Sequence, residues 1–211
     1  MKLPLLAVVA GLAFAAVAVQ AQNQPLAQPE TQSQYETQHK VAIYLNPVFS
    51  RISNPADTGV FAFLGPGTTS RMFYGWDLGS YDDFLHSHSS DIGVDVRGSF
   101  LRGNGAHLNS FLVGPRFVFK PQAKLKPYVE GLIGVARSRA ATNPRGLSSF
   151  QYGVLGGADY SFSPHVDFRM VEIGYNAAQT IGSGVFTGNG GSNILTSKMI
   201  NISTGLVFRF K

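Results

Sequence analysis

Hydrophobic and polar positions alternate along most of this chain with a period of two, and the last run shows the pattern best. Between positions 200 and 210, every even position except Thr204 carries a bulky apolar side chain, while the odd positions 199 to 209 are mostly small or polar. Successive side chains of a strand point to opposite faces. This run therefore predicts a β-strand with one apolar face and one mostly small or polar face.

Seven earlier runs repeat this split between turn signals rich in Gly, Pro, Asn and Ser. They cover residues 40–51, 71–81, 91–102, 108–120, 126–139, 150–162 and 166–178, of which the first two are the least regular. Each run is long enough to cross hydrocarbon at a tilt, which takes about 9–11 residues. An even number of such strands can close without an exposed edge. The pattern predicts an all-β fold, an eight-stranded antiparallel up-and-down transmembrane β-barrel.

Alternation alone does not decide which face points outward. Charges of both signs suit a narrow interior in which acids and bases pair, whereas Phe, Ile and Val suit contact with lipid tails. We therefore place the charged face inside. The alternative is a soluble lipocalin-like barrel whose charges meet water. The face that we place inside carries Asp77, Asp95, Arg97, Arg116, Glu130, Asp159, Glu172 and Arg209.

The composition agrees with a barrel that meets two environments. Only 14% of the residues are charged, whereas Gly occurs 24 times and Phe 16 times; a soluble domain carries about a quarter charged residues. The absence of Cys excludes a disulfide scaffold and an amino-terminal lipidated Cys. The net charge of +5 is compatible with anionic lipid and with nucleic acid alike, so it selects no partner by itself.

The first 39 residues differ from the rest of the chain. Residues 1–21 combine one Lys, an apolar run and the exit sequence Val19-Gln20-Ala21, which predicts a cleaved signal peptide. Residues 22–39 are rich in Gln, Pro, Thr and Ser, which predicts a disordered periplasmic leader. The barrel would then occupy residues 40–211. An uncleaved membrane anchor is the alternative for the first segment.

The expected connections fall into two groups. Residues 121–125 and 163–165 form short turns, whereas 52–70, 141–149 and 180–196 form long loops rich in Gly, Asn and Ser. Bacterial barrels have short turns at the periplasmic end and long loops at the outer end. Two connections depart from this rule: 103–107 is short for the outer end, and 82–90 is long for the periplasmic end.

Several segments resemble the eight-stranded OmpA-like outer-membrane barrel family over residues 40–211. They are HLNSFLVGPRFVFK, KPYVEGLIGVARSRA, VDFRMVEIGYN and STGLVFRF, at 107–120, 126–140, 166–176 and 203–210. The resemblance implies a barrel without a peptidoglycan-binding domain, exported to the outer membrane. It also implies that Leu206, Phe208 and Phe210 form the signal read by the barrel assembly machinery, although Lys211 follows the last aromatic residue.

The sequence offers little evidence for chemistry. His86 and His88 could bind a metal with a third ligand, but the spacing fixes none, and a polar turn is the simpler interpretation. His107 and Ser110 could suggest a lipid hydrolase, but no orienting third group accompanies them. The Gly-rich segments 103–105 and 188–191 precede no helix and indicate loop tips. We therefore predict no catalytic residue, metal, cofactor or nucleic-acid partner.

Two charged groups remain as candidate sites. Buried charges must pair, so we expect a lumen network that plugs the barrel; a thin water-filled pore is the alternative. The second group lies at strand ends next to the long loops, where Arg forks could contact phosphates of outer-membrane lipid and lipopolysaccharide; simple solvation of the strand ends is the alternative. The network comprises Asp95, Arg97, Arg116, Glu130, Asp159, Glu172 and Arg209, and the rim comprises Arg51, Arg71, Arg102, Arg137, Arg139, Arg145 and Lys198.

These observations predict a non-enzymatic integral outer-membrane protein with a structural or surface-interaction role. A small pore and a soluble ligand-binding barrel are the alternatives. A pore would conduct ions, and a carrier would stay in solution without detergent and bind an apolar ligand. The pattern selects no surface partner and no oligomeric state.

Overall fold

The computed structural model describes residues 40–53, 69–119, 124–139, 146–180 and 196–210. The signal peptide and leader predicted for residues 1–39 lie outside this part of the chain. Within it, no helix is long and apolar enough to cross a membrane. The strands are β1 (Lys40–Ser53), β2 (Ser70–His86), β3 (Ser90–Gly103), β4 (Ala106–Phe119), β5 (Leu125–Arg139), β6 (Leu147–Ser161), β7 (Val166–Thr180) and β8 (Thr196–Phe210).

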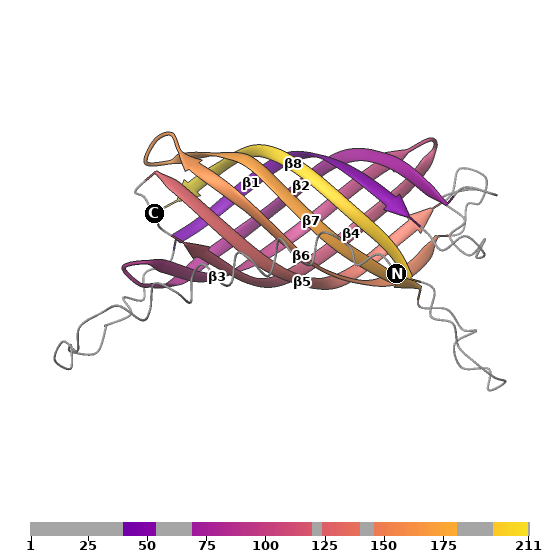
Figure 1. Ribbon diagram of the computed structural model, residues 1–211, viewed down its shortest axis with the longest axis horizontal. Helices are drawn as coiled ribbons and strands as arrows, with labels where there is room; N and C mark the ends of the chain where they lie inside the picture. The colour runs from indigo at the N-terminus through magenta and orange to yellow at the C-terminus, as the bar shows by residue number, and fades with distance from the viewer. Residues whose placement is uncertain (1–39, 54–68, 120–123, 140–145, 181–195, 211) are drawn as a thin grey trace, which may run out of the picture. The chain divides into compact units, whose positions relative to one another are not determined.

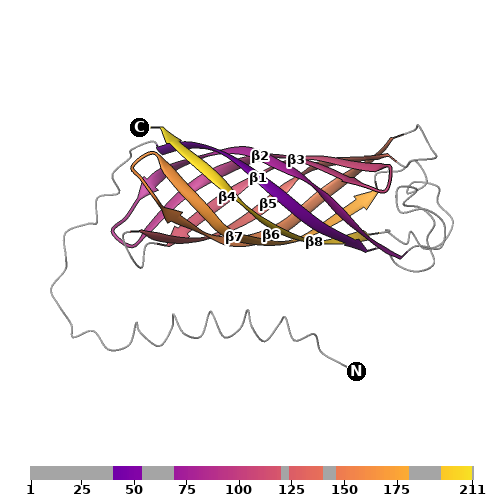
Figure 2. The same ribbon diagram turned by 90° about the horizontal axis from the view of Figure 1, so that it is seen from above.

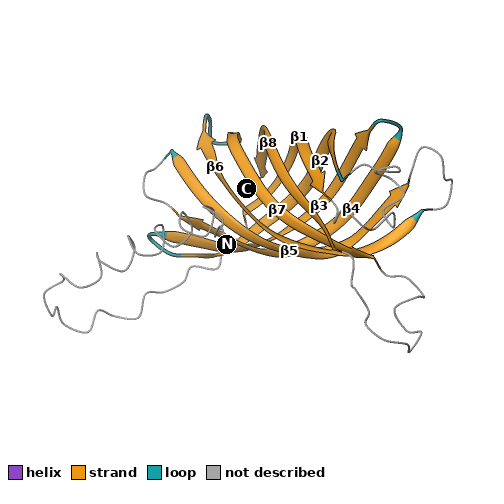
Figure 3. Cartoon of the chain, turned by 45° about the vertical axis from the view of Figure 1, so that its right-hand side comes forward, coloured by secondary structure: helices purple, strands orange, loops and turns teal. Residues whose placement is uncertain are grey.

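The eight strands close into one antiparallel barrel (Figure 1). Each strand pairs with its neighbours in sequence, and β1 pairs with β8 to complete the ring. Figure 3 shows the strands crossing the barrel at a common tilt. Closure satisfies the backbone groups of every strand within the sheet, which hydrocarbon requires. The predicted all-β fold, an eight-stranded up-and-down transmembrane barrel, is confirmed.

The barrel has two different ends. We call the end that holds the start of β1 and the finish of β8 the terminal end, and the opposite one the loop end; Figure 2 shows β8 finishing beside the start of β1. At the loop end, β3 and β4 are joined by a two-residue hairpin. Asn104 (φ 53°) and Gly105 (φ 78°) are both left-handed there, as a type I′ turn requires.

One connection is shorter than the sequence predicts. Residues 82–90 were expected to form a long connection, but β2 continues to His86 and β3 begins at Ser90. A register shift between Asp83 and Leu85 lets the strand continue through this polar stretch. The amide of Ser87 closes the turn by donating to the carbonyl of Ser90 at 2.8 Å. The departure from the rule of short terminal-end turns therefore disappears.

The outer face of the barrel is apolar. Large hydrophobic side chains stand exposed on every strand, for example Phe49 at 61% and Ile133 at 55%. Aromatic residues gather towards both ends: the pairs Phe49–Tyr74 and Trp76–Phe100 lie near the loop end, and Tyr160–Phe168 lies near the terminal end. An apolar band between two aromatic girdles is the surface that a transmembrane barrel presents to lipid.

The interior is layered along the barrel axis. The half nearer the terminal end holds most of the buried charges, followed by a polar layer that includes Ser110 and Gln151. A cluster of buried apolar side chains lies in the lumen towards the loop end, which the alternation pattern did not predict. This cluster, here called the apolar cap, comprises Val48, Ile52, Phe73, Leu101, Ala106, Leu108, Ala136, Ala178 and Met199.

Candidate functional site

Arg97 on β3 is the centre of the buried charged network. Its guanidinium donates to Glu172 on β7 through Nη1 at 2.6 Å and through Nη2 at 3.0 Å, a two-pronged contact. Nη2 also donates to Glu130 on β5 at 3.2 Å, and Nη1 lies 3.5 Å from Asp77 on β2. Charge-assisted, two-pronged contacts are stronger than neutral hydrogen bonds. Arg97 therefore ties four strands together across the lumen.

Arg116 on β4 forms the second centre of the network. It donates to Glu130 through Nη1, and to Asp159 on β6 through Nη2 at 3.0 Å. Its guanidinium carbon also lies 4.1 Å from the ring centroid of Tyr81 and 3.9 Å from that of Tyr128. A planar guanidinium between two aromatic faces gains cation–π attraction that compensates part of its lost hydration.

Arg169 on β7 is a third centre that the sequence analysis did not place inside. It donates to Asp159 through Nε at 2.9 Å and to Glu172 through Nη1 at 3.0 Å. Strict alternation puts Arg169 on the same face as Val171, towards lipid. A register shift between Arg169 and Glu172 leaves both Met170 and Val171 exposed, which turns Arg169 inward. An Arg at mid-strand on a lipid-facing register was the signal for this bulge.

Tyrosine hydroxyl groups add further hydrogen-bond donors to the carboxylates of the network. Tyr44 donates to Asp95 at 2.8 Å and accepts a hydrogen bond from Arg97 Nε at 2.9 Å. Tyr128 donates to Glu172 at 2.6 Å. Buried polar groups cost free energy unless they are paired, and these donors let more carboxylates than arginines stay inside the barrel.

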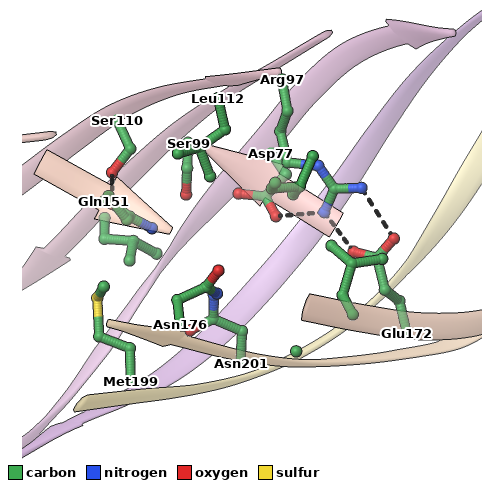
Figure 4. Close-up of a pocket in the computed structure, with 14 residues that line it drawn as sticks. Asp77, Arg97, Ser99, Ser110, Leu112, Gln151, Glu172, Asn176, Met199 and Asn201 are labelled. Atoms are coloured by element: carbon green, nitrogen blue, oxygen red, sulfur yellow. Dashed lines mark hydrogen bonds and ion pairs between the residues drawn. The ribbon is translucent and has the colours of Figure 1, made fainter. Parts of the chain in front are cut away.

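Little space remains between the network and the apolar cap. A cavity of about 10 Å³ lies between them, lined among others by Arg97, Glu172, Ser110, Gln151 and Met199. Figure 4 shows the Arg97–Glu172 contact at one end of this cavity and the Ser110–Gln151 hydrogen bond at the other. That volume is about the size of one water molecule. The lumen is therefore filled by side chains over this region.

The structure brings most of the predicted network residues together, with one exception. Asp95, Arg97, Arg116, Glu130, Asp159 and Glu172 are in mutual contact. Arg209 is not among them: it lies at the terminal end, 2.8 Å from Asp167, and donates to the carbonyl of Ser163. Its position near the end of β8 puts it beyond the reach of the network. Arg169 occupies the place expected for a third arginine.

The histidines considered for chemistry are not assembled into a reactive site. The ring of His86 lies 2.5 Å from the carboxylate of Asp91, while His88 is exposed in the turn. No group of three or more metal-ligating side chains occurs within the part of the chain that the structure describes. His107 faces outward, whereas the Ser110 hydroxyl points inward and donates to Gln151 at 2.7 Å. The hydrolase pair is therefore split between two faces of β4.

The predicted rim is not a uniform ring. Arg51, Arg102 and Lys198 are exposed at the loop end, and so are Arg137 and Arg139. Arg71 was expected to contact lipid, but it lies on the inward register of β2, because it has the same strand parity as the buried Phe73. Arg145 lies outside the described residues. The residues predicted as the assembly signal, Leu206, Phe208 and Phe210, are exposed on the outer face of β8.

Comparison with known proteins supports the fold and goes no further. No family model matches this chain. No curated protein sequence matches it either. Solved structures do match. The attachment invasion locus protein Ail of Yersinia pestis is 13% identical, with 82% of this chain and 99% of that chain covered at a TM-score of 0.50.

Two further barrels have lower structural similarity scores. The Neisserial surface protein A is 15% identical, with 80% of this chain and 99% of that chain covered at a TM-score of 0.48. The outer membrane protein OprG of Pseudomonas aeruginosa is 12% identical, with 84% and 98% covered at a TM-score of 0.41. At these identities the similarity concerns the barrel architecture, and function has to be argued from the residues of this chain.

Proposed function

We propose that this chain is a non-enzymatic integral protein of a bacterial outer membrane, with a closed lumen and a structural or surface-interaction role. The observation that carries the proposal is the division between the two faces of the barrel. Large apolar side chains are exposed outside, and the ion pairs of Arg97, Arg116 and Arg169 are buried inside. Closed barrels of this kind are bacterial outer-membrane structures.

The closed lumen is supported by two successive obstacles. Ions entering from the terminal end meet arginines already paired with carboxylates, as Arg169 is with Asp159. Ions entering from the loop end meet the apolar cap, and a dry apolar constriction blocks conduction by excluding water. The water-sized cavity between them leaves no continuous path in the filled region.

The two alternatives require features that differ from these. A soluble carrier needs an apolar cavity inside and a polar surface outside, whereas Phe49 and Tyr74 stand more than half exposed and the interior is filled. A small pore needs a hydrated channel between the charged side chains. The distances between Arg97 and its partners, from 2.6 to 3.5 Å, are direct contacts that leave no water layer between them.

Cell fractionation followed by gel mobility with and without boiling tests the membrane location. We expect the protein in the outer-membrane fraction, with a mobility shift on boiling that reports a closed barrel. Protein free in the periplasm would instead favour the carrier. Purified protein in a planar bilayer tests the closed lumen: we expect no steady conductance, and a large persistent conductance would favour the pore.

Substitution on the outer face tests its contact with lipid. Ile133 stands at the middle of β5 and is 55% exposed. We expect Ile133→Arg to destabilise the barrel in vesicles by about 2–4 kcal/mol, because the charge would lie at the bilayer midplane. Ser53→Arg is the matched control, since Ser53 ends β1 at the loop end, where an added charge should cost about 0–1 kcal/mol. Equal effects of both would contradict a lipid-facing surface.

A further inference from the structure

Basic side chains on the outer face gather over three neighbouring strands at the loop end. Strand register sets Arg102 on β3 opposite His107 on β4, and His107 opposite Arg139 on β5. The next row down sets Asn109 opposite Arg137. Side chains directly opposite each other in adjacent strands lie close together. Two rows of donors therefore stand side by side on one patch of the barrel.

The patch is hollowed into a cleft of about 380 Å³, lined by His107, Asn109, Arg137, Arg139 and Gly146. That volume lies within the range of small-molecule sites, about 300–1,000 Å³. Gly146 contributes to the shape of the cleft: a Cβ added there would lie 2.7 Å from Nε of Arg137. The guanidinium of Arg137 thus packs directly over a position that carries no side chain.

Among the described residues, the cleft has no acidic side chain that would balance its positive charge. On the described strands, the acidic residues lie in the lumen or towards the terminal end, with Asp82 as the only one on an outward register. Among the described residues, no ion pair joins Arg102, Arg137 or Arg139 to an acid. Cations that are close together repel one another, so an anion bound between them would relieve that repulsion.

The level of the cleft indicates where such an anion would come from. One step further along the outer faces of β4 and β5, below Asn109 and Arg137, stand Phe111 and Val135, which are 57% exposed and directly paired. Phe150 on β6 pairs with Val135 in turn. These residues belong to the apolar band and its aromatic girdle. The cleft therefore lies where headgroups of the surrounding lipid would be.

We propose that this cleft binds a phosphate monoester carried by the headgroup of an outer-leaflet glycolipid. The guanidiniums of Arg137 and Arg139 match phosphate oxygens in geometry and charge, and Asn109 and His107 add further donors. The proposal rests on the proposed membrane location for the source of the phosphate. In this proposal, lipid phosphate binds at one site on β4 and β5 and not around a uniform cationic rim.

Native mass spectrometry of the full-length protein in octyl glucoside tests the site, with diphosphorylated lipid A as the probe. We expect one bound lipid per barrel, and binding at least about tenfold weaker in the double variant Arg137→Gln/Arg139→Gln, which loses two charge-assisted contacts. Arg51→Gln/Lys198→Gln is the matched control: it removes the same charge from the loop end, but on β1 and β8, away from the cleft. Equal losses in both variants would overturn the proposal in favour of diffuse attraction.

Two further arms identify the ligand and the geometry. Lipid A stripped of its phosphates should not compete, and inorganic phosphate should compete only weakly; displacement by phosphate at similar concentrations would overturn the lipid source. Gly146→Ala keeps every charge but pushes the guanidinium of Arg137 aside, so it should weaken binding several-fold; unchanged binding would overturn the built cleft. The mobility shift on boiling is recorded for each variant, so that failure of the barrel itself is recognised separately.

Discussion

The charged network and the apolar cap both keep water out of the lumen, but they depend on different physical properties. In the network, Glu172 accepts hydrogen bonds from Arg97, Arg169, Tyr128 and Ser203, so its stabilisation depends on atom positions and on charge. The cap is built from apolar side chains: Leu108 and Leu101 are almost completely buried, so their contribution depends on packing and volume and not on charge. A change that keeps shape but removes charge should damage only the first.

This difference teaches how the two halves of the lumen tolerate substitution. Removing one partner of a buried ion pair leaves an uncompensated charge in a region of low dielectric constant, whereas removing a methyl group leaves a cavity. Isosteric changes that remove charge should therefore destabilise the network, and changes of side-chain volume should destabilise the cap. Trp76 is the single tryptophan of the chain and stands on the outer face, so its fluorescence can follow unfolding in vesicles without touching either layer.

The largest effect is expected at Glu172. Glu172→Leu should lower the free energy of unfolding by about 3–5 kcal/mol, because Arg97 and Arg169 would lose a buried counter-charge. Urea unfolding in lipid vesicles, followed through Trp76, measures this loss. Glu172→Gln keeps the shape and an acceptor oxygen, and we still expect a clear loss from it. An isostere as stable as the parent protein would show that charge at Glu172 is not what holds the network.

Leu108 tests the apolar cap in the same way. It lies opposite Leu101 in the β3–β4 register and is 2% exposed. Leu108→Ala should cost about 2–5 kcal/mol, because it removes buried methyl groups and leaves a cavity. The volume-conserving control Leu108→Met should cost less than about 1.5 kcal/mol. If Leu108→Met were as harmful as Glu172→Gln, the two layers would not differ in the way described.

The sequence predicted the strands and the faces better than the contents of the lumen. Alternation located all eight strands because one face meets lipid, which demands apolar side chains without interruption. Side chains inside the barrel can be either polar or apolar. Leu101 and Leu108 point inward and are as apolar as the residues that meet lipid. An apolar inner residue beside an apolar outer one breaks the period-two signal, so the cap could not be recognised.

The lumen network was predictable only where alternation stays in phase. Arg97, Arg116 and Glu130 keep the parity of their strands and were placed inside. Arg169 was missed because the bulge before Glu172 changes the parity within β7, and a bulge has no period of its own. Arg209 keeps its parity but stands too close to the strand end to reach the network. Parity gives the face of a residue and not its depth along the barrel.

A smaller effect is expected at Tyr128, which contacts the network through both its hydroxyl group and its ring. Its hydroxyl donates to Glu172 at 2.6 Å, and its ring lies against the guanidiniums of Arg116 and Arg169. Tyr128→Phe removes only the hydroxyl and should cost about 1.5–3 kcal/mol, the range for a hydrogen bond to a charged group. Tyr128→Leu also removes the ring and should cost more, by urea unfolding in vesicles. Equal losses would mean that the ring contributes no cation–π attraction.

The smallest effect is expected at Ser110, which lies between the two layers. Its hydroxyl donates to Gln151 at 2.7 Å beside the cavity of about 10 Å³. Ser110→Ala should cost about 1 kcal/mol or less, because one water entering the cavity can replace the lost donor. Ser110→Ala/Gln151→Leu removes both partners and should be nearly neutral, since the site would then resemble the apolar cap. The single variant Gln151→Leu completes the comparison. If the double variant lost at least as much free energy of unfolding as Ser110→Ala and Gln151→Leu together, this layer would behave like the charged network, in which polar contacts cannot be exchanged for apolar ones.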